Sequence, residues 1–161
     1  MFTIRPASAE DLPILSALFR ERHEGDPLYI DENLVEAMLD GRLPGSLLLS
    51  FQDETPVGYC CYSVYGSLHN ARTEMVLDDI YVTPAYRKRY FGKLMLNTAV
   101  RTASELVCTH ITFTCTEETG ILFFSHCSAP EPVDGRYTVE MTGVPHLGEF
   151  HPTCGDHHKP F

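Results

Sequence analysis

The sequence contains few basic residues. Only 12 of its 161 residues are Lys or Arg, against 22 Asp and Glu, and the formal net charge is −10 with histidine neutral. Proteins that bind a nucleic-acid backbone over a broad face carry the opposite excess. We therefore expect no nucleic-acid partner. An acidic chain favours cationic small molecules or peptides, although the same charge is also typical of a protein that is merely soluble.

The sequence also lacks long apolar runs. None approaches the roughly 20 residues of a membrane-spanning helix, and the densest runs are at 47–49 and 121–124. The opening MFTIRPASAEDLP has no basic region followed by an apolar one, unlike a secretory signal peptide. We expect no membrane partner, a cytoplasmic location and a single domain over 1–161, with an irregular tail at about 144–161.

Six cysteines are present, but their placement argues against a disulfide framework. Cys60 and Cys61 are adjacent in a strand-like run, so their side chains should point to opposite faces of a sheet. Cys108 and Cys115 flank or lie in another such run. Buried free thiols in a reducing compartment are therefore the expectation.

The end of the chain carries histidine and cysteine at three-residue spacings, in HPTCGDHH. Such residues could close on a tetrahedral ion together with His126 or Cys127. The spacing matches no zinc-binding pattern, so we expect incidental histidines in an irregular tail and no metal site. A metal-binding protein built on this tail is the alternative.

Hydrophobic periodicity predicts the order of strands and helices. Strands are expected at 2–5, 46–51, 57–65, 74–82, 110–115 and 136–142, and helices at about 8–22, 31–41, 92–106 and 120–127. Consecutive strands before the long helix favour antiparallel pairing, whereas the strand–helix–strand unit after them favours a parallel pair. The expected fold class is α/β (α+β), with a mixed, mostly antiparallel central sheet and helices on both faces.

Short signals mark the ends of the first two helices. Ser8, followed three positions later by Asp11, has the pattern of a capping box. Asp31 is the expected cap of the second helix, and Gly41 is expected to end it.

One basic segment stands out on the acidic chain. Arg87, Lys88, Arg89 and Lys93 fall within seven positions, in a loop that leads into the helix expected from Gly92. Backbone amides and the helix dipole at such a terminus attract anions. The segment therefore suits a small polyanion such as a pyrophosphate, and an ordinary solvated surface is the alternative.

The string LDDIYVTPAYRKRYFGKLM, residues 77–95, resembles the acetyl-CoA-binding motif of the GNAT superfamily of N-acetyltransferases. In that family a strand of the form L-(D/E)-D-(hydrophobic)-Y-V precedes P-x-Y-R and a (Q/R)-x-x-G-x-(G/A) loop. Arg87 stands at the first position of this loop and Gly92 at the last, while Tyr90 replaces a glycine. The opening IRPASAEDLPILSALF and the element order are also similar to the family, and the chain looks closest to its diamine and polyamine acetyltransferases.

The resemblance implies acetyl-CoA as cosubstrate, lying between the strands at 74–82 and 110–115. Its pantetheine arm would pair with the backbone of Ile80, Tyr81 and Val82. Backbone amides of the basic loop would hold its pyrophosphate. The loop residues implied are Arg87, Lys88, Arg89, Tyr90, Phe91, Gly92 and Lys93. Phe124, where the family has a tyrosine, would pack on the pantetheine.

The resemblance also implies direct attack of a primary amine on the thioester. Asp78 would be the base, usually through water, with Asp79 on the opposite side of the strand in a structural role. A loop-anchoring carboxylate is the alternative for Asp78. Phe124 cannot protonate the departing thiolate, so we expect Ser125, or its neighbours His126 or Cys127, to substitute. Otherwise the thiolate leaves unprotonated or through water, or the domain is a non-catalytic acyl-CoA-binding module.

In this family the loop between the first two helices contributes to acceptor specificity. Here it reads ERHEGDPLYIDE and carries Glu21, Glu24, Asp26, Asp31 and Glu32. Glu24 and Asp26 are the residues expected to contact a cationic acceptor, and an ordinary polar loop is the alternative. The expected partner is a small-molecule amine or a peptide amine. Members of the family often form dimers, so a homodimer is an assembly to test.

Overall fold

The computed structural model describes residues 1–24, 32–114 and 136–140. The elements are β1 (Phe2–Pro6), the short 3-10 helix η1 (Ala9–Asp11), α1 (Leu12–Arg22), α2 (Glu32–Leu39), β2 (Ser46–Gln52), β3 (Thr55–Ser67), β4 (Arg72–Val82), the 3-10 helix η2 (Pro84–Tyr86), α3 (Phe91–Glu105), β5 (His110–Thr114) and β6 (Arg136–Glu140). The helix predicted at 120–127 lies outside the described residues. No helix in the described ranges is long and apolar enough to cross a membrane.

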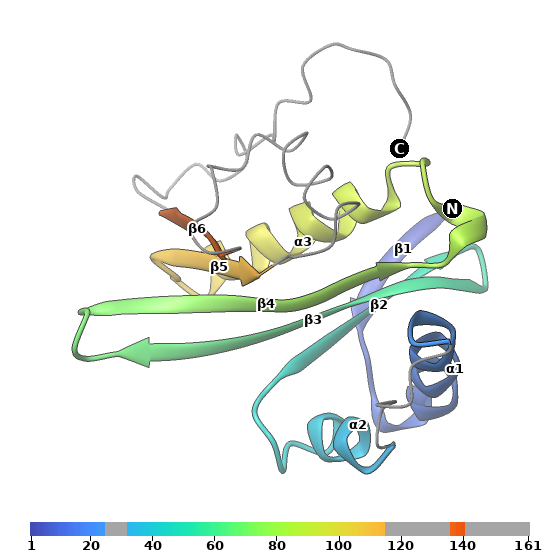
Figure 1. Ribbon diagram of the computed structural model, residues 1–161, viewed down its shortest axis with the longest axis horizontal. Coiled ribbons are helices and arrows are strands. Elements are labelled where there is room, and N and C mark those ends of the chain that lie inside the picture. The colour runs from blue at the N-terminus through green and yellow to red at the C-terminus, as the bar shows by residue number, and fades with distance from the viewer. Residues whose placement is uncertain (25–31, 115–135, 141–161) are drawn as a thin grey trace.

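The described strands form one sheet in the order β1-β2-β3-β4-β5-β6 (Figure 1). Neighbouring strands are antiparallel except for β4 and β5, which run parallel. A parallel pair requires a long crossover connection, and α3 provides it. The predicted mixed, mostly antiparallel sheet is therefore confirmed.

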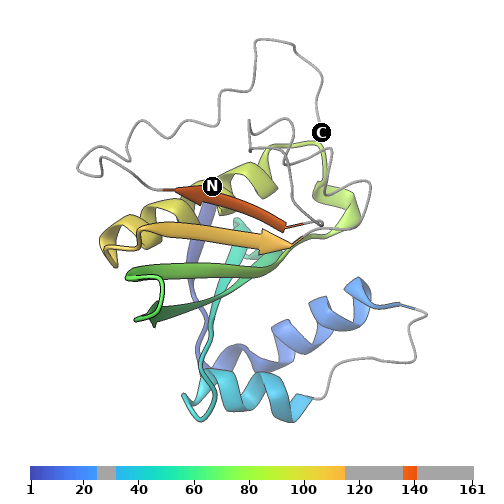
Figure 2. The same cartoon turned by 60° about the vertical axis from the view of Figure 1, so that its left-hand side comes forward.

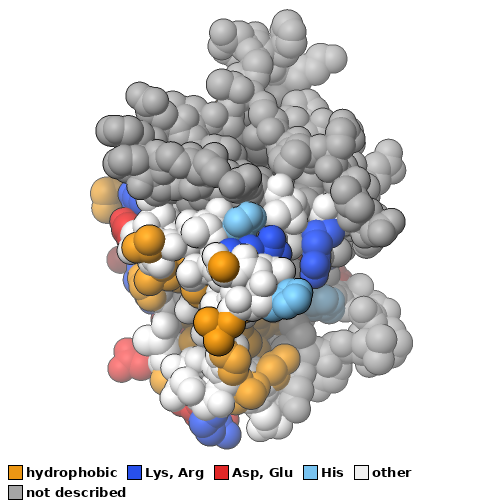
Figure 3. All heavy atoms as spheres, turned by 90° about the vertical axis from the view of Figure 1, so that its left-hand side faces the viewer, with side chains coloured by type: hydrophobic (Ala, Val, Ile, Leu, Met, Phe, Trp, Pro, Cys, Tyr) orange, Lys and Arg blue, Asp and Glu red, His pale blue; other side chains and the backbone are white. Residues whose placement is uncertain are grey.

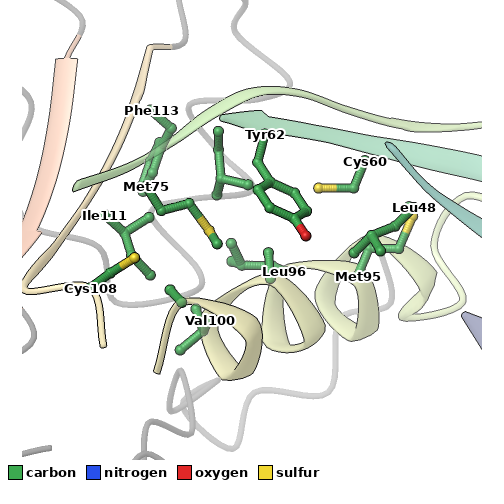
Figure 4. Packing of buried hydrophobic residues seen from close by; sticks show 13 residues of the cluster. Leu48, Cys60, Tyr62, Met75, Met95, Leu96, Val100, Cys108, Ile111 and Phe113 are labelled. Atoms are coloured by element: carbon green, nitrogen blue, oxygen red, sulfur yellow. The ribbon is translucent and has the colours of Figure 1, made fainter. Parts of the chain in front are cut away.

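Helices cover both faces of the sheet, as predicted (Figure 2). On one face α3 packs against β3, β4 and β5 (Figure 4), through a buried cluster that includes Cys60, Met75, Leu77, Met95, Leu96, Val100 and Ile111. On the other face α1 and α2 pack through a cluster that includes Leu15, Leu18, Val35, Leu49, Tyr59 and Tyr81. Cys61 contacts this second cluster, so the opposite orientations predicted for Cys60 and Cys61 are confirmed. Cys60, Cys61 and Cys108 are free thiols.

The capping box predicted at the first helix is present. The Ser8 amide donates to Asp11 Oδ2 at 2.8 Å, and the Asp11 amide donates to the Ser8 carbonyl at 2.9 Å. Arg5 donates to both oxygens of Asp11 at 2.7 Å, and this pair holds the pKa of the Asp11 carboxyl well below its usual range. The contacts tie β1 to the start of α1. At the next helix, α2 ends at Leu39, just before Gly41, which has φ 78°.

The C-terminal end of α3 has the hydrogen bonding of a Schellman motif. The Cys108 amide donates to the Ala103 carbonyl at 2.8 Å, and Val107 between them has φ 56°. This left-handed position normally belongs to glycine, and a β-branched residue is unfavourable there. Val107 is 76% exposed.

Figure 3 views the end of the molecule where β3 turns into β4, and exposed apolar side chains lie there beside basic and histidine side chains.

β4 pairs with β5 along only part of its length. The register joins Glu74–Leu77 to His110–Phe113, whereas β3 accompanies β4 as far as Val82. The β3–β4 register shifts at Asp78, which is an extra residue between the partners of Cys61 and Tyr62. A bulge of this kind bends its strand, and the pairing of β4 with β5 ends at Leu77, just before the bulge. Within the described part of the chain, one edge of 78–82 therefore has no strand partner.

Candidate functional site

Some backbone groups of β4 point away from β3, toward the edge that has no strand partner in the described part of the chain. The Thr83 amide donates to the Val57 carbonyl at 2.9 Å, so the backbone groups of Thr83 point toward β3. Successive residues of a strand direct their backbone groups to alternate sides, so Tyr81 also points toward β3 while Ile80 and Val82 point to the open edge. Arg87 Nε donates to the Val82 carbonyl at 2.9 Å, in agreement with this direction. Of the three predicted pantetheine partners, Ile80 and Val82 thus have the required orientation.

The basic segment lies between the end of β4 and the start of α3. Phe91 is buried, with its ring centroid 4.8 Å from that of Phe2 and 5.7 Å from that of Tyr86. Arg89 lies 5.6 Å from the centre of the Tyr86 ring, and Arg87 lies 5.6 Å from the centre of the Tyr81 ring. These contacts fix the course of the segment and place two of its guanidinium groups. Lys88 is exposed, and Gly92 and Lys93 are half-buried in the first turn of α3.

Two residues of this segment have a left-handed backbone. Lys88 has φ 62°, and Tyr90, the N-cap of α3, has φ 67°. Tyr90 stands at the position where the family motif has glycine, and glycine adopts this conformation without steric cost. A residue with a Cβ pays about 1–2 kcal/mol for it. The departure noted in the sequence thus falls on a position whose backbone favours glycine.

Asp78 and Asp79 lie on the same face of the sheet, so the prediction that they face opposite sides is wrong. Asp78 Oδ2 accepts a hydrogen bond from the Ser63 hydroxyl at 3.3 Å, and Asp79 Oδ2 accepts one from the Tyr59 hydroxyl at 2.6 Å. Tyr59 and Ser63 alternate with their neighbours along β3 and therefore share one face, the face that α1 covers. The physical reason is the bulge, because its extra residue interrupts the alternation of side chains along β4.

The two carboxylates have different surroundings. Asp79 lies 3.6 Å from Arg22 Nε in addition to its bond from Tyr59, so it has the structural contacts expected for it. Asp78 is exposed and forms no ion pair with any Lys or Arg of the described residues. Its other neighbour is the Cys61 thiol, with Sγ 3.8 Å from Oδ2. Burial, with the Asp78 charge beside it, raises the pKa of Cys61 to about 12, so this thiol stays protonated and remains a donor.

Tyr81 connects α1 to the basic segment. Its hydroxyl donates to Glu21 at 2.7 Å, and its ring lies 5.9 Å from the Arg22 guanidinium and 5.6 Å from that of Arg87. Burial, with the Glu21 carboxylate, raises the pKa of Tyr81 to about 12. Glu21, one of the acidic residues of the predicted acceptor loop, is therefore engaged within the protein.

The remaining predicted site residues are placed less completely. Glu24 is exposed just after α1. Asp26, Phe124 and Ser125, together with the histidines and Cys154 of the tail, lie outside the described residues. Among 1–24, 32–114 and 136–140, no cluster of His, Cys, Asp and Glu is arranged to hold a metal ion.

Glu74 is a third carboxylate on β4, besides Asp78 and Asp79, and no sequence motif pointed to it. Glu74 is 2% exposed, accepts a hydrogen bond from Tyr65 at 2.9 Å and another from Thr112, and lies 3.0 Å from Arg72. Burial raises the pKa of Glu74, but the hydrogen bonds and the Arg72 charge outweigh it and the net shift is downward. It is thus an ionised, fully bonded carboxylate. No local signal in the sequence marks it, because its partners lie on three strands.

Comparison with known proteins agrees with this geometry. The model of the acetyltransferase (GNAT) family matches residues 11–121 of the chain. No curated protein sequence matches it.

Solved structures share the fold at low sequence identity. The PaiA N-acetyltransferase of Thermoplasma acidophilum in complex with coenzyme A has a TM-score of 0.63 and 17% identity, covering 86% of this chain and 96% of that one. An aminoglycoside acetyltransferase from a soil metagenomic sample, meta-AAC0020, in complex with trehalose, has a TM-score of 0.69 and 16% identity over 82% and 91% of the two chains. Arabidopsis thaliana NAA60 in complex with a bisubstrate analogue has a TM-score of 0.70 and 15% identity over 89% and 99%.

Proposed function

Because this chain belongs to the acetyltransferase (GNAT) family, we propose that it is an N-acetyltransferase that transfers the acetyl group of acetyl-CoA directly to a primary amine. One observation carries the proposal. The open edge of β4 lies between a basic segment on one side and an exposed carboxylate, Asp78, on the other. A polar, anionic cosubstrate and a cationic acceptor therefore each have matching chemistry at one end of the same strand segment.

The residues present fit coenzyme A. The backbone groups of Ile80 and Val82 at the open edge suit the amide-containing pantetheine arm. The free amides of the first turn of α3, with Lys88 and Lys93, suit the pyrophosphate. When bound, acetyl-CoA supplies an activated acetyl thioester. The related N-acetyltransferase in complex with coenzyme A supports this cosubstrate.

At the other end of the segment, Asp78 binds the acceptor. Its exposed carboxylate attracts an ammonium group, and no described Lys or Arg neutralises its charge. It then accepts the proton that the amine must lose before attack, directly or through one water. The Ser63 hydroxyl and the Cys61 thiol orient the carboxylate by donating to Oδ2.

The acceptor that we propose is a small-molecule amine or a peptide amine, contacted also by Glu24 and Asp26. Proteins of the same fold include an aminoglycoside acetyltransferase and a ribosomal-protein-alanine N-acetyltransferase, which supports either class. Ser125, next to Phe124, is the group that we propose to protonate the departing thiolate. Because a thiolate leaves readily, we expect Ser125→Ala to slow the reaction without abolishing it.

The proposal is tested by binding and by turnover on the full chain. Acetyl-CoA and CoA should raise the melting temperature, because each binds the folded state only. A panel of amines with acetyl-CoA should yield CoA and an acetylated amine. Both products are followed by mass spectrometry, since a thiol dye for CoA would also react with accessible cysteines of the protein such as the partly exposed Cys61. Binding without turnover across the panel would favour a non-catalytic acyl-CoA-binding module. Absence of any thermal shift would contradict both.

A further inference from the structure

Tyr90 is a large aromatic side chain on the outside of the basic segment. It is 57% exposed, and its backbone is left-handed with φ 67°. Glycine would fit this position without steric cost, whereas a residue with a Cβ is disfavoured there. The protein therefore keeps a bulky ring at a position that does not favour one.

The neighbours of Tyr90 are held in place, but its own ring is not. Phe91 is buried against Phe2 and Tyr86, and Arg89 lies over the Tyr86 ring. Within the described part of the chain, the Tyr90 side chain makes no hydrogen bond and no ring contact. Its backbone is fixed, since its carbonyl accepts the Leu94 amide at 3.0 Å as the first bond of α3. The ring is thus exposed, while the backbone that carries it is fixed at the N-terminus of α3.

Basic residues flank Tyr90 in the sequence. Lys88 and Arg89 precede it and Lys93 follows it within the first turn of α3. An aromatic face among cations is the combination that proteins use to bind a base together with phosphates. In coenzyme A the adenosine, which carries a 3′-phosphate, follows directly on the pyrophosphate.

We propose that Tyr90 stacks on the adenine of coenzyme A and so selects the complete cosubstrate over forms without the nucleotide. This inference rests on the proposed function, because it needs the pyrophosphate at the first turn of α3. The pantetheine end would be recognised at β4 and the adenine end at Tyr90. The 3′-phosphate would interact with the cations and not with the ring.

The test compares wild type with Tyr90→Phe and Tyr90→Asn by calorimetry. Phenylalanine keeps the ring, and asparagine removes it while tolerating a left-handed backbone. The ligands are CoA, dephospho-CoA and 4′-phosphopantetheine, the last measured by displacement. We expect Tyr90→Asn to weaken CoA and dephospho-CoA by the same factor of about tenfold, to leave 4′-phosphopantetheine unchanged, and Tyr90→Phe to match wild type.

Fluorescence gives a second readout that does not depend on activity. The chain has eight tyrosines and no tryptophan, so its emission comes from tyrosine. Adenine stacked on Tyr90 should quench part of this emission, and Tyr90→Phe should lose that part while still binding CoA.

The outcomes separate the two proposals. If Tyr90→Asn binds CoA as tightly as wild type, or weakens 4′-phosphopantetheine by the same factor as CoA, the role of Tyr90 is overturned and the proposed function stands. If wild type binds none of the three ligands, the proposed function itself is overturned. Melting temperatures of the free variants confirm that each is folded before its affinity is compared.

Discussion

The hydroxyl of Tyr59 donates a hydrogen bond of 2.6 Å to Asp79, and this contact distinguishes two adjacent carboxylates. Asp79 also lies near Arg22, so its charge is balanced inside the protein. Asp78 points to the same face of the sheet but is exposed beside the open edge of β4. One carboxylate therefore links α1 to the sheet, while the other faces solvent.

This difference predicts that the same substitution at the two positions affects different properties, catalysis at Asp78 and stability at Asp79. We expect Asp78→Asn to lower kcat/KM by about 100-fold or more, since a positioned base contributes at least that much, with little change in unfolding free energy. Asp79→Asn should instead lower the unfolding free energy by about 1–3 kcal/mol. Steady-state kinetics and urea denaturation on both variants check this. Unchanged turnover in Asp78→Asn would show that Asp78 is not the base.

Removal of the Tyr59 hydroxyl should destabilise the fold. Burial and the Asp79 charge raise the pKa of Tyr59 far above its usual value, so the hydroxyl stays protonated and donates throughout the accessible pH range. We expect Tyr59→Phe to cost about 1–2 kcal/mol in urea denaturation. Tyr62→Phe is the matched control, because Tyr62 is also buried in β3 but packs on the other face of the sheet. Equal losses in the two variants would contradict the importance of the Asp79 contact.

The Arg5–Asp11 pair predicts a loss of stability in acid. Arg5 lowers the pKa of Asp11 in the folded state, so the folded protein binds this proton less readily than the unfolded chain does. The stabilisation is therefore complete above the unfolded pKa of about 4 and is lost as pH falls below it. We expect Asp11→Asn to cost about 1–2 kcal/mol at pH 7. The difference in unfolding free energy between Asp11→Asn and wild type should become smaller as the pH falls from about 5 to about 3, the range around the unfolded pKa. A difference that stays constant over this range would refute the explanation.

Glycine in place of Val107 should stabilise the protein. Val107 has φ 56° and is largely exposed, so its side chain contributes strain and little burial. We expect Val107→Gly to raise the unfolding free energy by about 1 kcal/mol. The neighbouring Leu106 has φ −85°, and Leu106→Gly should have the opposite sign because no strain is relieved there. Thermal denaturation of both variants decides the point.

Much of the fold could be predicted from the sequence because its strands and helices have clear periodicity. The alternation of Cys60 and Cys61 between two faces and the parallel pair across α3 follow from local rules and are confirmed. At most ends of the described helices and strands, the predicted bound and the observed bound differ by a few residues.

The candidate site could be predicted only in part. The motif at residues 77–95 pointed to Asp78 and to the basic segment. The regular alternation of side chains along a strand then predicted that Asp78 and Asp79 face opposite sides of the sheet. The bulge that cancels this alternation depends on how β4 pairs with β3, and no residue of β4 shows it. The partners of Asp79 come from positions far away in the chain, Tyr59 and Arg22, so they too required the tertiary structure.

The extra residue in β4 determines which changes of chain length this strand can tolerate. Met75 and Leu77 precede Asp78 and face α3, and Ile80 and Val82 follow it and face α3 as well. If Asp78 itself were deleted, Leu77 would be followed directly by Asp79, and Ile80, Tyr81 and Val82 would keep their present faces and β3 partners. A deletion at Ile80 would instead turn Tyr81 into the α3 core and Val82 toward α1, which would disrupt both cores at once. An alignment of this chain with a shorter relative should therefore place a one-residue gap in this strand at Asp78.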